Sequence, residues 1–105
     1  MVDPMIYLSR ERVLDFAAAN RLVTSFDVGR ELVRQGGLVS YGPILTTRYA
    51  RVAEYVDKIL KGSKPGDLPV QQPTEFALAV NLKTASALGV TVPPALLARA
   101  DEVVR

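Results

Sequence analysis

The most constraining feature of this sequence is its alternation of β-rich runs with helical periodicities. Strand-like runs lie at residues 4–8, 22–26, 38–41 and 76–80. Helical patterns occupy about 10–20, the stretch between Asp27 and Gly36, about 44–61, 81–88 and about 94–104. Strands that alternate with helices of this length imply parallel pairing through right-handed crossovers. The sequence therefore predicts an α/β fold, a partial three-layer arrangement around a parallel sheet.

Polar and glycine residues mark the expected helix boundaries. A side-chain oxygen at an N-cap can accept a hydrogen bond from an unpaired helical N–H, and glycine tolerates the positive φ that follows many helices. We expect the N-caps at Ser9, Asp27 and Asn81. We expect the helix ends at Gly36-Gly37, Gly62 and Gly89, and Pro94 in the first turn of the last helix.

The longest predicted helix, at about 44–61, is strongly amphipathic. Its apolar residues recur every three or four positions, whereas the opposite face is charged. The apolar positions are Leu45, Tyr49, Val52, Val56, Ile59 and Leu60. The pattern predicts that Tyr49, Val52 and Val56 are core positions and that the charged face is solvated.

The sheet predicted here has an edge problem. Parallel sheets are usually covered on both faces, yet the first strand-like run begins almost at the start of this chain. An uncovered strand edge is a template for association with another chain. The chain therefore reads as an α/β domain entered part-way, either as part of a longer protein or with its edge covered by a second copy.

Composition excludes several classes of chemistry. The 105 residues suit one small domain and include no Cys and no His. Thiolate nucleophiles, imidazole bases and the usual zinc, haem and iron–sulfur ligands are therefore absent. There is no phosphate-cradling glycine loop or nucleophile-elbow motif either. We expect no enzyme activity, no cofactor and no metal site.

Charge and hydropathy also argue against nucleic-acid and membrane partners. The formal net charge is only +2, and Lys58, Lys61 and Lys64 form a weak basic cluster without a broad patch. Nothing approaches the ~20 consecutive apolar residues of a membrane span. The first residues carry no basic and apolar leader pattern, so the chain as written is expected in the cytoplasm.

Three stretches of the sequence resemble a known family. They are GGLVSYGP at 36–43, ILKGSKPGDLPVQQPT at 59–74 and NLKTASALGVTVPPALLARADEV at 81–103. Together they are similar to the C-terminal region of substrate-binding proteins of bacterial ABC transporters, the group with tryptophan- and other amino-acid-related binding proteins. The resemblance covers nearly the whole chain but only about the last third of a family member.

The resemblance implies a type I periplasmic binding fold, in which two α/β lobes close on a small ligand. Residues 1–62 would be part of the second lobe, 63–81 a loop and hinge-crossing strand, and 82–105 C-terminal helices packed on the first lobe. It further implies an amino-acid-like ligand, an ABC permease as partner and a periplasmic location for the parent protein.

Three places qualify as ligand contacts, because ligands of open α/β sheets meet the loops at the carboxyl ends of strands. The first choice is Ser40-Tyr41-Gly42-Pro43, where Tyr41 could stack on a ligand or hydrogen-bond to it, or else be a core tyrosine before a tight turn.

The two other places come earlier in the chain. Ser25-Phe26-Asp27 could bind a carboxylate through Ser25 and backbone N–H groups, or Asp27 could simply cap the next helix. Asp3 could hold a ligand ammonium group, or be an ordinary terminal residue.

Three functions follow from these observations. The leading one is the solute-binding component of an ABC-type importer, present as its C-terminal part. The alternative is a truncated, self-associating fragment without independent ligand binding, expected as a homodimer that exchanges residues 74–105. A small flavodoxin-like enzyme is supported by fold type alone.

Overall fold

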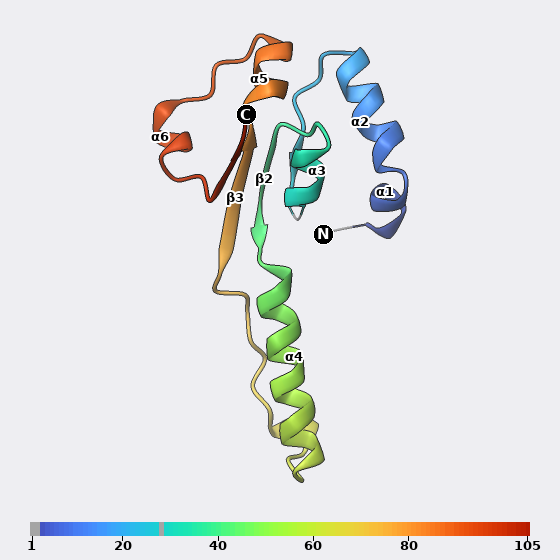
Figure 1. The fold of residues 1–105 in the computed structure, drawn as a ribbon. Coiled ribbons are helices and arrows are strands. Elements are labelled where there is room, and N and C mark those ends of the chain that lie inside the picture. Colours follow the sequence, from blue (N-terminus) through green and yellow to red (C-terminus); the bar gives the residue numbers. More distant parts are fainter. Residues whose placement is uncertain (1–2, 28) are drawn as a thin grey trace. The chain divides into compact units, whose positions relative to one another are not determined.

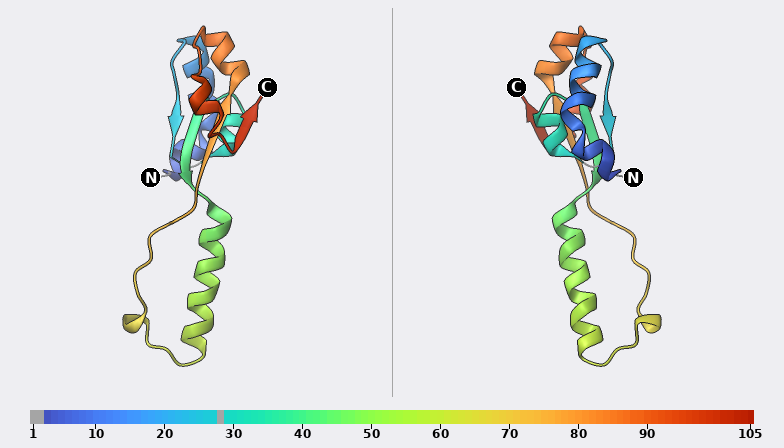
Figure 2. Two further views of the ribbon diagram at one scale, coloured as in Figure 1. Left: turned by 90° about the vertical axis from the view of Figure 1, so that its left-hand side faces the viewer. Right: turned by 90° about the vertical axis from the view of Figure 1, so that its right-hand side faces the viewer.

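The computed structural model describes residues 3–27 and 29–105, which form a mixed α/β fold of two compact units. Unit 1 combines the described residues up to Gly42 with Ala77–Arg105, and unit 2 is Pro43–Phe76. In both views of Figure 2 the N-terminal helices and the C-terminal segment belong to the same unit. Distant parts of the sequence therefore build one core.

Unit 1 is organised around a four-stranded sheet in the order β1-β2-β3-β4 (Figure 1). The strands are β1 (Ser25–Phe26), β2 (Val39–Pro43), β3 (Phe76–Asn81) and β4 (Glu102–Val104). β1 pairs with β2, and β3 with β4, in parallel. The predicted parallel pairing is confirmed for these two pairs.

The central pair, β2 and β3, runs antiparallel. The N–H of Asn81 at the end of β3 donates to the carbonyl of Leu38 just before β2, at 2.9 Å. The chain leaves unit 1 at the end of β2 and returns at the start of β3, so β3 retraces the direction of β2 (Figure 1). The sequence pattern did not indicate this reversal, because unit 2 stands where a crossover helix was expected.

Helices flank the strands of unit 1. They are α1 (Pro4–Leu8), α2 (Arg10–Ala19), α3 (Arg30–Arg34), α5 (Leu82–Leu88) and α6 (Pro94–Leu97). The buried apolar residues are Leu14, Ala17, Leu32, Val33, Leu38, Ala77, Leu78, Ala79, Val80 and Ala85. They come from α2, α3, α5 and β3 and from the residue before β2, so the core lies on β3 and the helices beside it.

Two predicted elements are wrong in type. Residues 4–8 form helix α1 and not a strand, since the Asp3 carboxylate accepts from the Met5 N–H at 2.7 Å and Pro4 suits the first turn. The last predicted helix ends at Leu97 and is followed by strand β4. Asp101 explains that change, because its N–H donates to the Leu78 carbonyl and its carboxylate accepts from the Leu78 N–H, both at 2.8 Å.

Two other elements are shorter than expected. The run at 22–26 contributes only Ser25–Phe26 to the sheet, and α3 begins at Arg30 with Gly29 as its N-cap, so the expected cap at Asp27 is wrong. Val28, within the predicted helix, lies outside the described residues. The caps at Asn81 and Gly89 are confirmed, since Asn81 Oδ1 accepts from the Thr84 N–H at 3.0 Å and Gly89 has φ 72°.

Asn81 is the polar centre of unit 1. Its side chain is buried, and Nδ2 donates to the Val33 carbonyl at 2.7 Å while Oδ1 caps α5. The Thr84 hydroxyl donates to the Gly36 carbonyl at 3.0 Å. These bonds of Asn81 and Thr84 join the end of α3, the end of β3 and the start of α5.

Arg34 and Glu102 tie α3 to β4 at the surface. Arg34 Nε lies 2.6 Å from Glu102 Oε1, and Nη2 lies 3.1 Å from Oε2. The hydrogen bond to Glu102, followed by its charge, raises the pKa of Arg34 above its ordinary value. The guanidinium therefore stays protonated throughout the physiological range.

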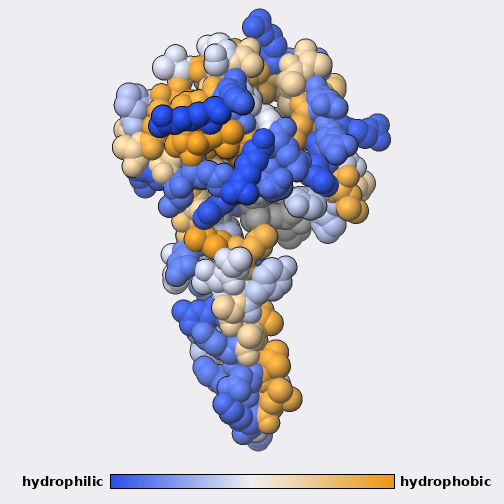
Figure 3. Space-filling view, viewed as in Figure 1, coloured by the Kyte–Doolittle hydropathy of each residue, from blue (hydrophilic) through white to orange (hydrophobic). Residues whose placement is uncertain are grey.

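Unit 2 consists of helix α4 (Leu45–Leu60), a short 3₁₀ turn η1 (Pro65–Asp67) and an extended return segment (Figure 2). The predicted helix at 44–61 is confirmed, but its predicted core positions are wrong: Tyr49, Val52 and Val56 are all exposed. Figure 3 shows apolar residues gathered along one side of this helix. Within unit 2, residues 43–76, this apolar face is exposed.

The two compact units divide the chain at 42/43 and 76/77, and the predicted assignment of 1–62, 63–81 and 82–105 to parts of a two-lobed receptor stays a prediction. α4 groups with the return segment, and residues 77–105 pack with residues before 43 of the same chain. The expected exchange of 74–105 between copies stays a prediction. No helix among residues 3–27 and 29–105 combines the length and apolarity needed to cross a membrane.

Candidate functional site

The carboxyl ends of β1 and β2 meet at one edge of the unit 1 sheet. The parallel register places Ser25 beside Val39 and Phe26 beside Ser40, so Tyr41 follows directly at the same edge. The structure thus brings together four of the five predicted contact residues, from segments 14 to 16 positions apart. Adjacent parallel strands make this edge a natural place for a ligand.

Ser40 and Tyr41 point to opposite environments, as successive strand residues must. Ser40 is only 2% exposed, whereas Tyr41 is 58% exposed. Ser40 therefore belongs to the packed side of the sheet. Tyr41 is largely exposed, so its aromatic ring is a surface on which a planar molecule can stack.

Phe26 and Ser25 also differ in their exposure to solvent. A Cβ added at Gly37 would approach Phe26 Cε2 to 2.6 Å, so the ring of Phe26 packs directly on the Gly37 backbone. Ser25 is exposed. Of the four predicted contacts at this edge, Ser25 and Tyr41 are therefore exposed, whereas Phe26 is partly buried and Ser40 is buried.

Asp3 does not join this cluster through any bond of its own. Its carboxylate caps α1 by accepting from Met5, which uses one of its oxygens in a local role. Its predicted place beside a first strand is wrong, since that segment is helical. A role for Asp3 toward a ligand ammonium group stays a prediction.

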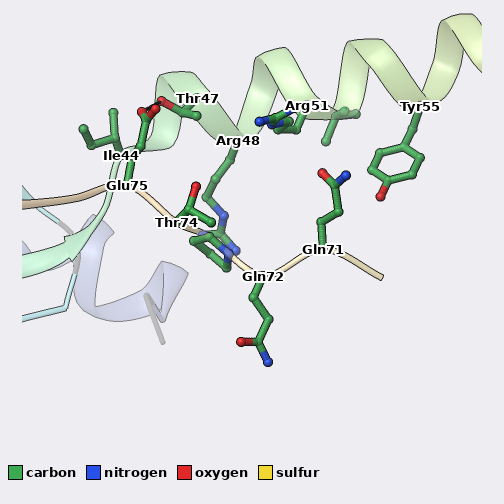
Figure 4. Close-up of a pocket in the computed structure, with 11 residues that line it drawn as sticks. Ile44, Thr47, Arg48, Arg51, Tyr55, Gln71, Gln72, Thr74 and Glu75 are labelled. Carbon is green, nitrogen blue, oxygen red and sulfur yellow. Dashed lines mark hydrogen bonds between the residues drawn. The ribbon is translucent and has the colours of Figure 1, made fainter. Parts of the chain in front are cut away.

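Sequence reasoning missed a hollow that lies within unit 2. A cavity of about 560 Å³ separates α4 from the return segment at residues 71–75. Figure 4 shows Arg48 and Tyr55 reaching from α4 toward that segment, while Gln72 points away. The remaining lining residues are Ile44, Thr47, Arg51, Val52, Gln71, Pro73, Thr74 and Glu75.

Few bonds hold the two sides of this hollow together. Thr47 Oγ1 donates to Glu75 Oε2 at 2.7 Å and the Ile44 N–H donates to the Glu75 carbonyl at 3.1 Å, both at one end. At the other end the Tyr55 hydroxyl donates to the Pro69 carbonyl. Between these ends Arg48 and Gln71 are exposed. The sequence predicts a solvated charged face for α4, which carries Arg48 and Arg51, but it gives no sign that residues 71–75 return beside that face.

Comparisons with known proteins give a consistent family assignment. The family model described as ABC transporter substrate binding protein matches residues 6–104. A search of curated proteins gives no significant match.

Two solved structures are similar over almost the whole chain. A conserved domain protein from Vibrio cholerae is 29% identical with a TM-score of 0.90, over 97% of this chain and 34% of that one. The ABC domain from Streptococcus pneumonia in complex with L-Trp is 25% identical with a TM-score of 0.88, over 99% of this chain and 35% of that one.

A third structure supports the fold alone. The ligand-free, open CD0873 from Clostridium difficile, a substrate binding protein with adhesive properties, is 23% identical with a TM-score of 0.60, over 98% of this chain and 34% of that one. The present chain thus spans about a third of the length of each solved relative.

Proposed function

Because the chain belongs to the family of ABC transporter substrate binding proteins, we propose that it is the C-terminal part of the solute receptor of an ABC-type importer. The match over residues 6–104 carries this proposal. Its role is binding and not catalysis, with an ABC permease as downstream partner and a periplasmic location for the full-length receptor.

The proposed ligand is an amino acid or a related small molecule. The relative solved with L-Trp supports this class, and so does the exposed aromatic ring of Tyr41 at the β1–β2 edge. An aromatic ring can stack on a planar ligand, and the Ser25 hydroxyl can hydrogen-bond a carboxylate or an ammonium group. We assign direct contact to Tyr41 and Ser25, a shaping role to Phe26 and Ser40, and ammonium binding to Asp3.

Recognition would depend on closure of two lobes around the ligand. The chain crosses between units 1 and 2 twice, at Gly42–Pro43 and at Phe76–Ala77. Two extended crossings of this kind suit a hinge, where a few residues absorb the change of backbone angles. We propose that these crossings are hinge strands of the full-length receptor.

A titration followed by NMR tests the ligand proposal on this chain. Because this chain supplies only part of the contacts of a two-lobed receptor, we expect weak, saturable chemical-shift changes when L-tryptophan is added at millimolar concentration. The changes should be centred on Ser25, Phe26 and Tyr41. Tyr41→Ala should reduce the apparent affinity at least ~5-fold through loss of the aromatic contact. Tyr49→Ala is the matched control, because Tyr49 is an exposed tyrosine on α4.

Two results would contradict the assignment. One is the absence of saturable shifts for tryptophan and for every other amino acid tested. The other is an equal effect of Tyr41→Ala and Tyr49→Ala. A tight, stoichiometric heat signal in calorimetry would instead show that this part binds without a facing lobe.

The second candidate function is self-association without ligand binding. The exposed apolar face of α4 favours it, since contiguous apolar surface in a monomeric protein marks an interaction site. Light scattering tests it, and a stable monomer at micromolar and higher concentrations would count against a homodimer.

A further inference from the structure

Gly37, in the turn between α3 and β2, has no room for a side chain. A Cβ at this position would lie 2.6 Å from Phe26 Cε2 and 3.0 Å from the Leu32 carbonyl oxygen. The contact with the ring is far shorter than an ordinary separation of two carbon atoms. Gly36 has φ 122°, whereas the φ of Gly37 lies outside the left-handed region. The need for glycine at 37 is therefore one of space and not of backbone conformation.

The Phe26 ring is turned back from the carboxyl edge of the sheet. The register places Phe26 beside Ser40. Its ring nevertheless reaches Gly37, which lies three residues before Ser40 and precedes the start of β2. Phe26 is only partly buried, so another side of its side chain is open to solvent.

Hydrogen bonds hold the turn against which this ring packs. The Leu38 N–H, next to Gly37, donates to Thr24 Oγ1 at 2.9 Å, and the Leu38 carbonyl accepts from the Asn81 N–H at 2.9 Å. Phe26 Cε2, in contrast, is the far end of a side chain that can rotate about two torsions. A methyl group added at Gly37 would therefore displace the ring more readily than the turn.

We propose that Gly37 is a positioning residue of the ligand edge at β1 and β2. The missing side chain at 37 lets the Phe26 ring lie back against the turn, and this leaves the carboxyl ends of the two strands open to an aromatic amino acid. The inference rests on the proposed function, because it concerns the same edge. Gly37 acts through Phe26, since a displaced ring would occupy part of the space that the ligand needs.

A double-mutant cycle with L-tryptophan tests this role. Gly37→Ala should weaken the apparent affinity in the NMR titration at least ~5-fold, because the displaced ring competes with the ligand for space. Phe26→Leu removes the obstructing atom, since leucine has no Cε2. In the Phe26→Leu background, Gly37→Ala should therefore change the affinity less than ~2-fold. A general defect of the turn would persist in both backgrounds.

Gly66→Ala is the matched control for the exchange of glycine for alanine. A Cβ at Gly66 would meet no atom within 4 Å, and its φ also lies outside the left-handed region. This variant should leave the affinity for tryptophan unchanged. The amide spectrum of residues 77–105 reports whether each variant remains folded.

A measurement on the wild-type chain does not depend on the folding of any variant. NOEs should connect the Phe26 ring protons with the Gly37 Hα protons in the free chain, and they should persist when L-tryptophan is added. Their absence in the free chain, or their loss on addition of tryptophan, would overturn the proposal, because the ring would then not lie back against the turn when the ligand binds.

The failure of this proposal can be distinguished from the failure of the ligand proposal. Saturable binding of tryptophan that Gly37→Ala leaves unchanged, or weakens equally in both backgrounds, would overturn the positioning role alone. The absence of saturable chemical-shift changes for every amino acid in the wild-type chain would overturn the ligand proposal, and the positioning role with it.

Discussion

The two units of this chain follow the same local rules but differ in what their helices achieve. Unit 1 holds all the buried residues found among the described positions, although its helices α1 and α3 have five residues each. Unit 2 holds the longest helix, α4, and buries nothing. An amphipathic pattern therefore indicates which face of a helix is suited to packing. It does not indicate whether that face is buried.

The largest expected difference between the two units is in the free energy of unfolding that a leucine side chain contributes. Leu32→Ala in α3 should lower the free energy of unfolding by about 2–4 kcal/mol, since Leu32 is 4% exposed and its loss leaves a cavity. Leu60→Ala in α4 should change it by less than about 0.5 kcal/mol, because that side chain is already in water. Urea unfolding at a concentration where the chain is monomeric measures both.

Similar losses for the two leucines would contradict this contrast. They would mean that unit 2 has a core of its own under these conditions, or that unit 1 is packed more loosely than its exposed fractions indicate.

A second test compares the contribution of a buried amide side chain to stability with that of an exposed one. Asn81→Leu should cost about 2–3 kcal/mol, because the Val33 carbonyl and the Thr84 N–H both lose their partner inside unit 1. Asn20→Ala is the matched control: its Nδ2 donates to the Phe16 carbonyl at 2.8 Å, but in an exposed position. Its loss should cost well under about 1 kcal/mol.

Thermal unfolding followed by circular dichroism distinguishes the two amides. A fall in Tm for Asn20→Ala as large as that for Asn81→Leu would show that burial is not what gives Asn81 its importance. A folded Asn81→Leu variant should also show faster amide exchange at Thr84, whose N–H donates to Asn81 Oδ1.

The difference between local and long-range interactions explains how much of the fold could be predicted from the sequence. Helix caps are local, so the cap at Asn81 and the ending at Gly89 followed from the residues themselves. The strand at 102–104 depends on pairing with β3, more than 20 residues away, and a helical period at 94–104 gave no sign of that pairing. Residues 4–8 have a β-rich composition, but the Asp3-Pro4 pair in front of them is a helix start signal, and they form α1.

The candidate site shows the same division. The rule that ligands meet strand ends predicted the cluster of Ser25, Phe26, Ser40 and Tyr41, and the parallel register brings them to one edge. Which of them is accessible could not be predicted, because exposure depends on tertiary packing: Ser40 is buried, and the Phe26 ring packs on the backbone of Gly37. The hollow beside Arg48 depends on the path of the return segment, which carries no periodic signal.

The smallest expected effect concerns the surface pair of Arg34 and Glu102, which joins early and late segments of unit 1. The pKa of Arg34 is raised by Glu102, so its folded-state pKa lies above its unfolded value. Stability from a raised pKa is fully present below the unfolded pKa and is lost only as pH rises through the folded one. Both values lie far above neutrality, so the contribution of Arg34 should not vary between about pH 6 and 9.

Salt is therefore the variable that should reveal this pair, because exposed charges are screened within about 3 Å at 1 M ionic strength. The Tm difference between wild type and Arg34→Gln should be small, constant over that pH range and reduced in 1 M NaCl. Arg51→Gln is the matched control, since its partner Glu54 lies 3.0 Å away on the same exposed helix of unit 2 and joins no distant segments. A Tm change for Arg51→Gln equal to that for Arg34→Gln would mean that joining α3 to β4 adds nothing beyond a local helical ion pair.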